Sequence, residues 1–245
     1  MKNILLCSGS GFSGKNLVTL FRNIKWSNVV SLNRKKNKKN YKNIKFIKQN
    51  LQNEIKTDFK SEYIILCANK HKIRDFEDKS NDSFSNNIMT AKRIIEYSKN
   101  KCNQPILIYF STIDISYKHT PPKKKIYIES KKKSEKLFLN ALKNNIFRKV
   151  FILRLPAILG ENCNKNFLSE TINKLRFNKT IEIWNSKNLY DNFIHINDLL
   201  RFIIHLIKKN KIYKNKSIFN CTVSKPQTTY QIISLMKKKI KSSSS

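Results

Sequence analysis

The chain has 245 residues, 40% of them hydrophobic, which is enough for one substantial core in one large domain or two small ones. No apolar run approaches the roughly 20 residues of a membrane-spanning helix, so such a helix is excluded and we expect a cytoplasmic protein. The five cysteines are an odd number and no pair has the spacing of metal ligands, so we expect reduced thiols and no metal site.

The formal net charge of +34 at pH 7 is the second compositional feature. A basic excess of this size can indicate nucleic-acid binding. Here lysine supplies almost all of it and is spread along the whole chain with many Asn and Ile residues, as a gene rich in A and T would encode. Arginine, the better reader of phosphates and bases, is scarce. We interpret the charge mainly as solvated surface and keep an RNA or polyanion partner as an alternative.

The first predicted elements are a buried strand at residues 4–7 and a helix at residues 15–24, joined by a G-x-G-x-x-G turn. The turn holds three of the only four glycines in the chain, so we favour a dinucleotide-binding turn over an ordinary tight turn. Glycine lacks the Cβ that would keep backbone N–H groups from a pyrophosphate, and the helix N-terminus attracts phosphate. The predicted contacts in this turn are Gly9, Gly11, Phe12, Ser13 and Gly14.

A second strand is predicted at residues 28–32, and Asn33 and Arg34 follow it. They lie about 20 positions after the glycine turn, where an NAD-binding fold usually has an acidic residue for the adenosine ribose. Neither residue is acidic, and Arg34 would suit a ribose 2′-phosphate. The sequence therefore favours NADP as the cofactor, with NAD as the alternative.

Further strands are predicted at residues 45–47, 63–68 and 106–110, alternating with helical stretches such as residues 80–100. This alternation predicts parallel βαβ units. The last of these strands delivers Ser111 and Thr112 at its C-terminal end, and this is the end of the strands where ligands bind in open α/β sheets.

Tyr127 and Lys131 are four residues apart and therefore share one face of a predicted helix. A neighbouring ammonium stabilises the ionised form of a phenol, whose ordinary pKa of about 10 makes it a poor proton donor or acceptor at neutral pH. Two other Tyr–Lys pairs in the chain have this spacing, but only Tyr127 follows a strand that ends in hydroxyl residues. We predict a catalytic Tyr127 and not an ordinary surface tyrosine.

With these motifs the chain resembles the extended short-chain dehydrogenase/reductase family, the NAD(P)-dependent sugar-nucleotide epimerases, dehydratases and reductases. The most specific match is Tyr127-Ile-Glu-Ser-Lys131 followed by Glu135, which is similar to Y-x-x-S-K-x-x-x-E. Thr112 lies in the segment that bears the family's catalytic hydroxyl, and Asn87 matches its structural asparagine. Ser8 stands where the family has the first glycine of its turn.

Residues 192–199 are similar to the family's R-D-F-I-H-V-x-D-L segment. Asp191 stands where many nucleotide-sugar enzymes carry an arginine for the diphosphate, so a UDP sugar is not expected to bind there in the usual manner. We interpret His195 as anchoring a strand and Asp198 as capping a helix that starts near Leu199.

The resemblance implies an α/β fold of the Rossmann type, a doubly wound parallel sheet in a single NAD(P)-binding domain over residues 1–241. A small C-terminal substrate lobe would come from about residues 160–190 and 220–241, followed by a disordered tail at 242–245. The resemblance also implies a homodimer that pairs through the helices around Ser80 to Asn100 and Lys131 to Asn144.

The function implied is hydride transfer at a carbonyl or hydroxyl carbon of a sugar, with a nucleotide sugar as the expected substrate class. Thr112 would donate a hydrogen bond to the substrate oxygen, Tyr127 would pass the proton, and Lys131 would lower the Tyr127 pKa and hold the nicotinamide ribose. The cofactor contacts implied outside the glycine turn are Asn33, Arg34, Ala68, Asn87 and Lys131.

Among activities of this kind, a keto-sugar reductase needs no further group, and an epimerase is the second choice. A dehydratase is disfavoured because Ile113 and Asp114 do not supply the pair of acids that it requires. Outside catalysis, the alternatives are a relative that uses its positive surface to bind RNA or another polyanion, and a regulator that senses the NADP redox state.

Overall fold

The computed structural model describes residues 1–7, 10–35, 40–68, 82–118, 122–183 and 185–243. The chain divides into two compact units. The first unit comprises Met1–Arg154 and Leu200–Asn220, and the second comprises Leu155–Leu199 and Cys221–Ser245. The single domain and lobe boundaries expected from the sequence stay a prediction.

The first unit is built on a seven-stranded sheet with the strand order β10-β6-β5-β4-β1-β2-β3. The strands β3, β2, β1, β4 and β5 run parallel, as do β6 and β10. From β1 the order continues to β2 on one side and to β4 on the other, which is the switch point of a doubly wound sheet. The bounds are β1 Lys2–Cys7, β2 Ser27–Asn33, β3 Ile44–Lys48, β4 Tyr63–Leu66, β5 Ile106–Thr112, β6 Lys149–Leu155 and β10 Lys216–Asn220. The predicted Rossmann-type fold is confirmed.

The central strands form because their residues are apolar on both faces, as is typical of a parallel sheet covered by helices. Residues 4–7 of β1 are completely buried, and every residue of β4 and β5 is buried. Each predicted strand in this sheet lies within two residues of the observed bounds. The sheet therefore brings the C-terminal ends of β1, β4 and β5 to one edge, where the predicted site residues follow.

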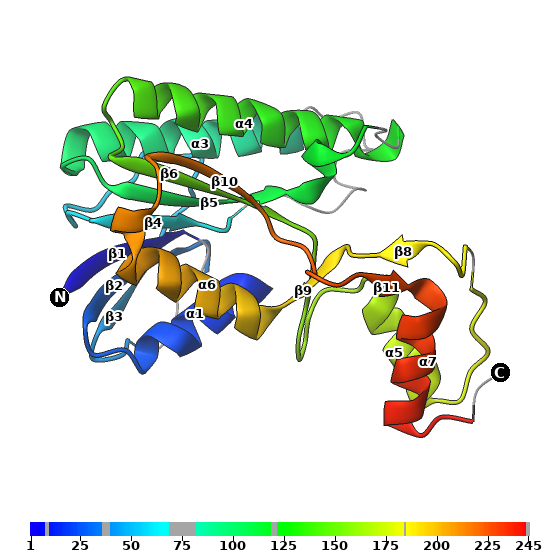
Figure 1. Cartoon of the computed structure of the whole chain (residues 1–245). Coiled ribbons are helices and arrows are strands. Elements are labelled where there is room, and N and C mark those ends of the chain that lie inside the picture. Colours follow the sequence, from blue (N-terminus) through cyan, green and yellow to red (C-terminus); the bar gives the residue numbers. More distant parts are fainter. Residues whose placement is uncertain (8–9, 36–39, 69–81, 119–121, 184, 244–245) are drawn as a thin grey trace. The chain divides into compact units, whose positions relative to one another are not determined.

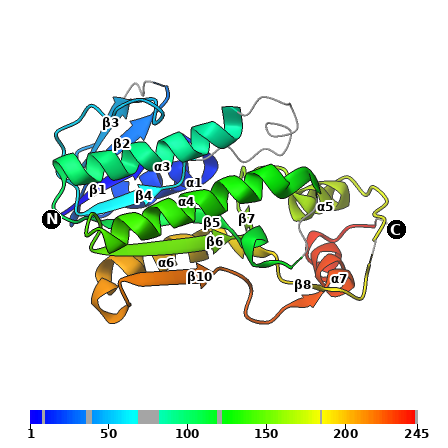
Figure 2. The ribbon, with the colours of Figure 1, turned by 90° about the horizontal axis from the view of Figure 1, so that it is seen from above.

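Helices cover both faces of this sheet (Figures 1 and 2). Helices α3 and α4 pack against each other on one face, and α1 and α6 lie on the other. Their bounds are α1 Phe12–Arg22, α3 Asp82–Lys101, α4 Lys125–Lys143 and α6 Ile196–Lys208. Three aromatic rings pack together between α4 and the sheet. The ring centroid of Phe138 on α4 lies 4.9 Å from that of Tyr109 and 6.2 Å from that of Phe147. This aromatic contact fixes α4 over β5.

Two segments differ from the expectation at helix N-termini. Helix α1 begins at Phe12, directly after Gly11, and not at Lys15. Helix α6 begins at Ile196, so the prediction that Asp198 caps a helix starting near Leu199 is wrong. Asp198 lies inside the first turn, and the ring nitrogen Nδ1 of His195 accepts from the backbone N–H of Asn197 at 3.2 Å.

The second unit has short strands and two helices. Strands β7 and β9 pair in parallel, β8 and β11 pair antiparallel, and α5 packs on α7. The bounds are β7 Ala157–Leu159, α5 Phe167–Arg176, β8 Leu189–Tyr190, β9 Phe193–His195, β11 Gln227–Thr228 and α7 Thr229–Ile240. Asn166 starts α5 because its side chain accepts from the backbone N–H of Ser169 at 3.0 Å.

None of the described helices combines the length and apolar character needed to cross a bilayer. The same described residues contain no group of three or more side chains placed to hold a metal ion. All five cysteines are described, and the structure has no disulfide between them.

Candidate functional site

The glycine turn leads directly into α1. Gly11 is the residue before the first turn, and the backbone N–H of Lys15 donates to its carbonyl at 2.8 Å. Gly11 has no side chain that accepts from the first N–H groups of the helix, and the first turn has no acidic residue. These N–H groups and the positive end of the helix dipole are therefore open to an anion. Phe12, Ser13 and Gly14 form the first turn, and Gly9 lies outside the described residues.

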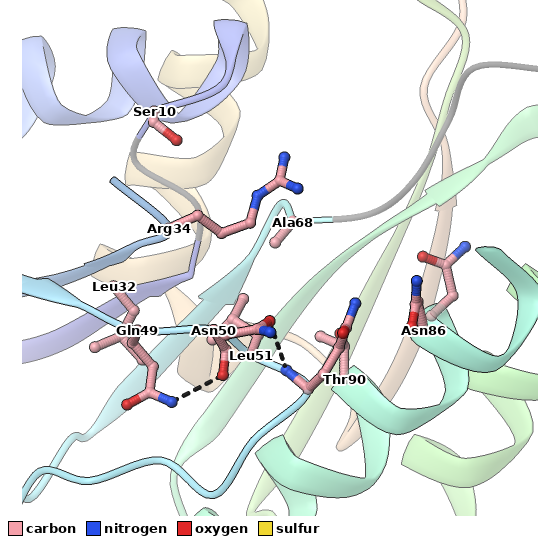
Figure 3. A pocket seen from close by; sticks show the side chains of 11 residues that line it. Ser10, Leu32, Arg34, Gln49, Asn50, Leu51, Ala68, Asn86 and Thr90 are labelled. Atoms are coloured by element: carbon pink, nitrogen blue, oxygen red, sulfur yellow. Dashed lines mark hydrogen bonds between the residues drawn. The ribbon is translucent and has the colours of Figure 1, made fainter. Parts of the chain in front are cut away.

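A pocket of the first unit lies beside this turn and collects residues from five parts of the chain (Figure 3). Its lining residues are Ser10, Leu32, Arg34, Gln49, Asn50, Leu51, Gln52, Ala68, Asn86, Asn87 and Thr90. The exposed Arg34 extends over the pocket beside Ala68 (Figure 3). Among the described residues, this lining contains one cation, several amides and no carboxylate. The guanidinium and amide groups can donate hydrogen bonds to a phosphate and to a purine base. They therefore suit the adenosine half of a phosphorylated dinucleotide.

Three predicted cofactor residues, Arg34, Ala68 and Asn87, line this pocket, and Asn33 does not. Asn33 ends β2 with 2% of its surface exposed, and its Oδ1 accepts from the Ser31 hydroxyl at 3.4 Å. Its buried Nδ2 has no hydrogen-bond partner among the described residues. The neighbouring amide residues Gln49 and Asn50, which the sequence analysis did not single out, follow β3 at the same edge.

Asn87 connects the pocket to the helix that carries Tyr127. It is 3% exposed on α3, and its Nδ2 donates to the Ser130 hydroxyl at 3.1 Å. The Ser130 hydroxyl in turn donates to the Tyr127 carbonyl at 2.7 Å. Asn87 therefore holds the first turns of α4 in place, in keeping with the structural asparagine that the family resemblance implies.

The structure brings Thr112, Tyr127 and Lys131 together. Thr112 is the last residue of β5, Tyr127 lies in the first turn of α4, and Lys131 lies one turn further along. The Tyr127 phenol is hydrogen bonded to the Thr112 side chain. Lys131 Nζ is 5.8 Å from the centroid of the Tyr127 ring and donates to the Phe110 carbonyl at 2.8 Å. The predicted catalytic residues thus form one cluster at the C-terminal end of β5.

The electrostatics of this cluster differ from the expectation that Lys131 lowers the Tyr127 pKa. Burial raises the pKa of Tyr127 to about 12, and the hydrogen bond to Thr112 lowers it only in part. Burial also lowers the pKa of Lys131 to about 7, against the opposing effect of the Glu135 charge. Both shifts arise because desolvation disfavours the charged form of each group. In this structure Tyr127 is therefore a protonated phenol at neutral pH.

Asp114 and Lys124 are functional neighbours that the motif search did not assign. Asp114 lies on the short 3-10 helix η1 (Ile113–Ser116), and Lys124 ends a second one, η2 (Pro122–Lys124). The Thr112 hydroxyl donates to Asp114 Oδ2 at 2.9 Å, and Lys124 Nζ lies 3.1 Å from Asp114 Oδ1. Asp114 could have been found in the sequence as the acidic residue two positions after Thr112. Nothing in the sequence distinguishes Lys124 from the other lysines.

A buried ion pair lies next to the cluster and connects α4 with β6. Arg154 on β6 donates to both carboxylate oxygens of Glu135, at 3.1 and 2.8 Å, and Glu135 is 5% exposed. The Ser111 hydroxyl also donates to Glu135 at 2.6 Å. The last acidic residue of the Y-x-x-S-K-x-x-x-E match thus connects α4 to the ends of β5 and β6.

The fold and cluster together define an α/β protein of the dinucleotide-binding class with a Tyr–Lys pair at the end of its fifth strand. Residues 4–222 match the family described as the NAD dependent epimerase/dehydratase family. Because the match covers most of the chain, the chain belongs to this family, which consists of NAD(P)-dependent enzymes. The resemblance to extended short-chain dehydrogenases/reductases is confirmed.

One similar curated protein is Protein PFF0380w of Plasmodium falciparum (isolate 3D7). The two sequences are 30% identical over 135 residues, which make up 55% of this chain and 5% of that protein. The chain therefore matches only a small part of the length of this relative.

Solved structures of sugar-nucleotide enzymes have the same fold. UDP-glucose 4-epimerase of Thermotoga maritima with UDP-glucose has a TM-score of 0.79 at 16% identity, covering 99% of this chain and 84% of that one. UDP-glucuronic acid 4-epimerase of Bacillus cereus in complex with NAD has a TM-score of 0.79 at 19% identity, covering 99% and 86%. WbmF of Bordetella bronchiseptica in complex with NAD+ has a TM-score of 0.80 at 15% identity, covering 100% and 80%. At these identities the likeness establishes the shared fold.

Proposed function

We propose that the protein is an oxidoreductase that reduces a carbonyl carbon of a sugar, with NADP as its cofactor and a nucleotide sugar as its substrate class. The observation that carries this proposal is the cluster of Thr112, Tyr127 and Lys131 at the end of β5. A bound nicotinamide cofactor would supply the hydride. The residues of this chain supply the proton, the orientation and the pocket.

Tyr127 is the proton donor of the proposed reaction. Its pKa, raised to about 12 by burial, keeps the phenol protonated at neutral pH but also makes it a weaker acid, so giving its proton to the oxygen of a carbonyl group that gains a hydride requires a group that stabilises the resulting phenolate. Lys131 lies within 5.8 Å of the Tyr127 ring, so its ammonium form would favour the phenolate that this proton transfer leaves. Thr112 orients the phenol through their hydrogen bond.

The pocket at Arg34 supports NADP as the preferred cofactor. A carboxylate that accepts from ribose hydroxyls would favour NAD, and the lining residues that the structure describes include none. The Arg34 guanidinium would instead pair with a 2′-phosphate, to which it can donate two hydrogen bonds. The open N-terminus of α1 would hold the pyrophosphate.

The substrate class is proposed from the family and from the similar structures, two of which are 4-epimerases of UDP sugars. Asp191 stands where the resemblance expects an arginine for the diphosphate, so we propose that the nucleotide diphosphate is bound differently here. The homodimer remains a proposal that rests on the resemblance alone.

The test is a fluorescence titration of the protein with NADPH and NADH, followed by NADPH oxidation with keto-sugar nucleotides. We expect saturable NADPH binding, weaker NADH binding, and turnover that Tyr127→Phe abolishes while NADPH affinity stays nearly unchanged. Unchanged turnover in Tyr127→Phe would refute the mechanism. Binding of neither cofactor would refute the enzyme proposal and favour the polyanion alternative, whose affinity should fall steeply with salt.

A sugar-nucleotide epimerase is the second candidate, favoured because two of the similar structures are 4-epimerases of UDP sugars. An epimerase returns its hydride to the substrate, so it interconverts two sugars with no net change in the cofactor. A reductase consumes one NADPH for each sugar reduced. Measuring NADPH and both sugars in one reaction therefore separates the two activities.

A further inference from the structure

The hydroxyl of Thr112 has a single hydrogen and can donate one hydrogen bond. Its Oγ1 lies 2.9 Å from Asp114 Oδ2, and a carboxylate has no hydrogen to give, so the hydrogen goes to Asp114. The other oxygen of Asp114, Oδ1, pairs with Lys124 and lies 3.1 Å from its Nζ. The Thr112 hydrogen is therefore committed to Asp114 in this structure.

This commitment fixes the direction of the hydrogen bond between Thr112 and Tyr127. Since Thr112 has no second hydrogen, the Tyr127 phenol must be the donor and Thr112 Oγ1 the acceptor. The backbone N–H of Asp114 donates to the same oxygen at 3.3 Å. Thr112 thus donates once and accepts twice, and its side chain has no capacity left. The hydrogen bonds run from Tyr127 through Thr112 to Asp114.

We propose that Asp114 is a positioning residue that competes with Tyr127 for the single hydroxyl hydrogen of Thr112. While Asp114 holds this hydrogen, Tyr127 keeps its own proton and is ready to donate it. When Tyr127 gives up its proton, Thr112 turns its hydrogen toward the phenolate, and Asp114 keeps only Lys124. Asp114 therefore favours the protonated phenol, the form from which carbonyl reduction starts, and holds its proton more tightly, a consequence that rests on the proposed function.

The Asp114 charge acts on Tyr127 in the same direction. Burial and the Asp114 charge raise the pKa of Tyr127, whereas Thr112 lowers it because its hydroxyl can donate to the phenolate. The other titratable groups nearby, among the described residues, include Lys124 on η2, which pairs with Asp114, Lys131 on α4, which donates to the Phe110 carbonyl, Glu135 on α4 and Tyr109 on β5. In contrast to these groups, Asp114 acts on the Tyr127 phenol in two ways, by its charge and through its hydrogen bond with Thr112.

The test follows the ionisation of Tyr127 in the cofactor-free protein, without substrate. Phenolate absorbance is measured against pH in parallel with the matching Tyr127→Phe protein, and the difference isolates Tyr127. With a pKa of about 12, about one-tenth of Tyr127 is ionised at about pH 11. In Asp114→Ala we expect the midpoint to fall by about one pH unit, so that about half is ionised at about pH 11. Asp114→Asn should change the midpoint in the same direction, and circular dichroism at each pH checks the fold.

Two controls separate competition for the hydrogen from a simple loss of charge. Glu129→Gln removes a carboxylate from an exposed position on α4, the helix that carries Tyr127. This change should leave the midpoint of Tyr127 ionisation unchanged. In a Thr112→Val background no hydrogen can be shared, so Asp114→Ala should lower the midpoint much less than it does with Thr112 present. An equal shift in both backgrounds would overturn the competition.

The outcomes also distinguish this inference from the proposed function. An unchanged midpoint in both Asp114→Ala and Asp114→Asn would overturn the inference even in a protein that reduces sugars. A lowered midpoint in a protein that transfers no hydride to any sugar would retain the link between Asp114 and Tyr127 and overturn the proposed reaction.

Discussion

Replacing Lys131 by methionine should stabilise the cofactor-free protein at neutral pH while it removes a proposed catalytic group. Lys131 is 3% exposed, and burial lowers its pKa from the ordinary 10.5 to about 7. This shift of three and a half units corresponds to about 5 kcal/mol of unfolding free energy, at about 1.4 kcal/mol per unit. Methionine also leaves the Phe110 carbonyl without its donor, at a cost of about 1–3 kcal/mol. We therefore expect a net stabilisation of about 2–4 kcal/mol near pH 7.

The dependence of this stabilisation on pH is the sharper part of the prediction. Because the folded-state pKa of Lys131 is lowered, the unfolded chain binds more protons between about pH 7 and 10.5, and the stability of the unsubstituted protein rises across this range. The penalty is complete below the folded-state pKa and disappears above 10.5. The advantage of Lys131→Met should shrink by about 1.4 kcal/mol per pH unit and change sign as the penalty disappears.

The assay is urea unfolding followed by far-ultraviolet circular dichroism at several pH values, with cofactor-free protein. The matched control is Lys132→Met, an exposed position on the same helix, which should change stability by no more than about 0.5 kcal/mol at every pH. A difference between Lys131→Met and the unsubstituted protein that stays constant with pH would refute the reasoning, because titration of Lys131 would then play no part.

Two further substitutions test the cofactor pocket and the buried ion pair. Arg34→Ser should weaken NADPH binding about 10- to 100-fold, because it removes a charge-assisted contact. NADH binding should stay nearly unchanged in the same fluorescence titration. An equal loss of affinity for both cofactors would contradict the 2′-phosphate assignment. Glu135→Gln leaves Arg154 without its buried carboxylate and should lower the free energy of unfolding by about 3 kcal/mol, whereas exposed Glu129→Gln should have little effect; equal urea midpoints for the two variants would contradict this.

The strands of the first unit could be predicted because their burial leaves a direct mark in the sequence. A strand covered on both faces is an apolar run, and the residues of β4 and β5 are all buried as their composition indicates. The strands β8 and β11 have two residues each, too few to show any period, so nothing in the sequence predicted them. The early start of α1 was missed because Phe12 to Gly14 have the composition of a turn.

The cluster of Thr112, Tyr127 and Lys131 was predicted from a motif, but its electrostatics were not. The spacing of Tyr127 and Lys131 predicts that they share a helix face, whereas their pKa values depend on how deeply the surrounding elements bury them. The direction of the hydrogen bonds through Thr112 depends on Asp114 Oδ2 lying 2.9 Å away, a distance set by the 3-10 turn after β5. Lys124 has no sequence signal in a chain with 50 basic residues.

The discontinuity of the first unit has a consequence for synthesis on the ribosome. Strand β6 ends at Leu155, but its partner β10 begins only at Lys216, and Phe151 packs on Tyr213 and Phe219 from this later segment. At about 5–20 residues per second, the ribosome needs roughly 3–12 seconds to make the intervening stretch of about 60 residues. During these seconds the nascent chain presents an unpaired strand edge with an uncovered phenylalanine, so we expect β6 to be prone to aggregation until translation reaches β10.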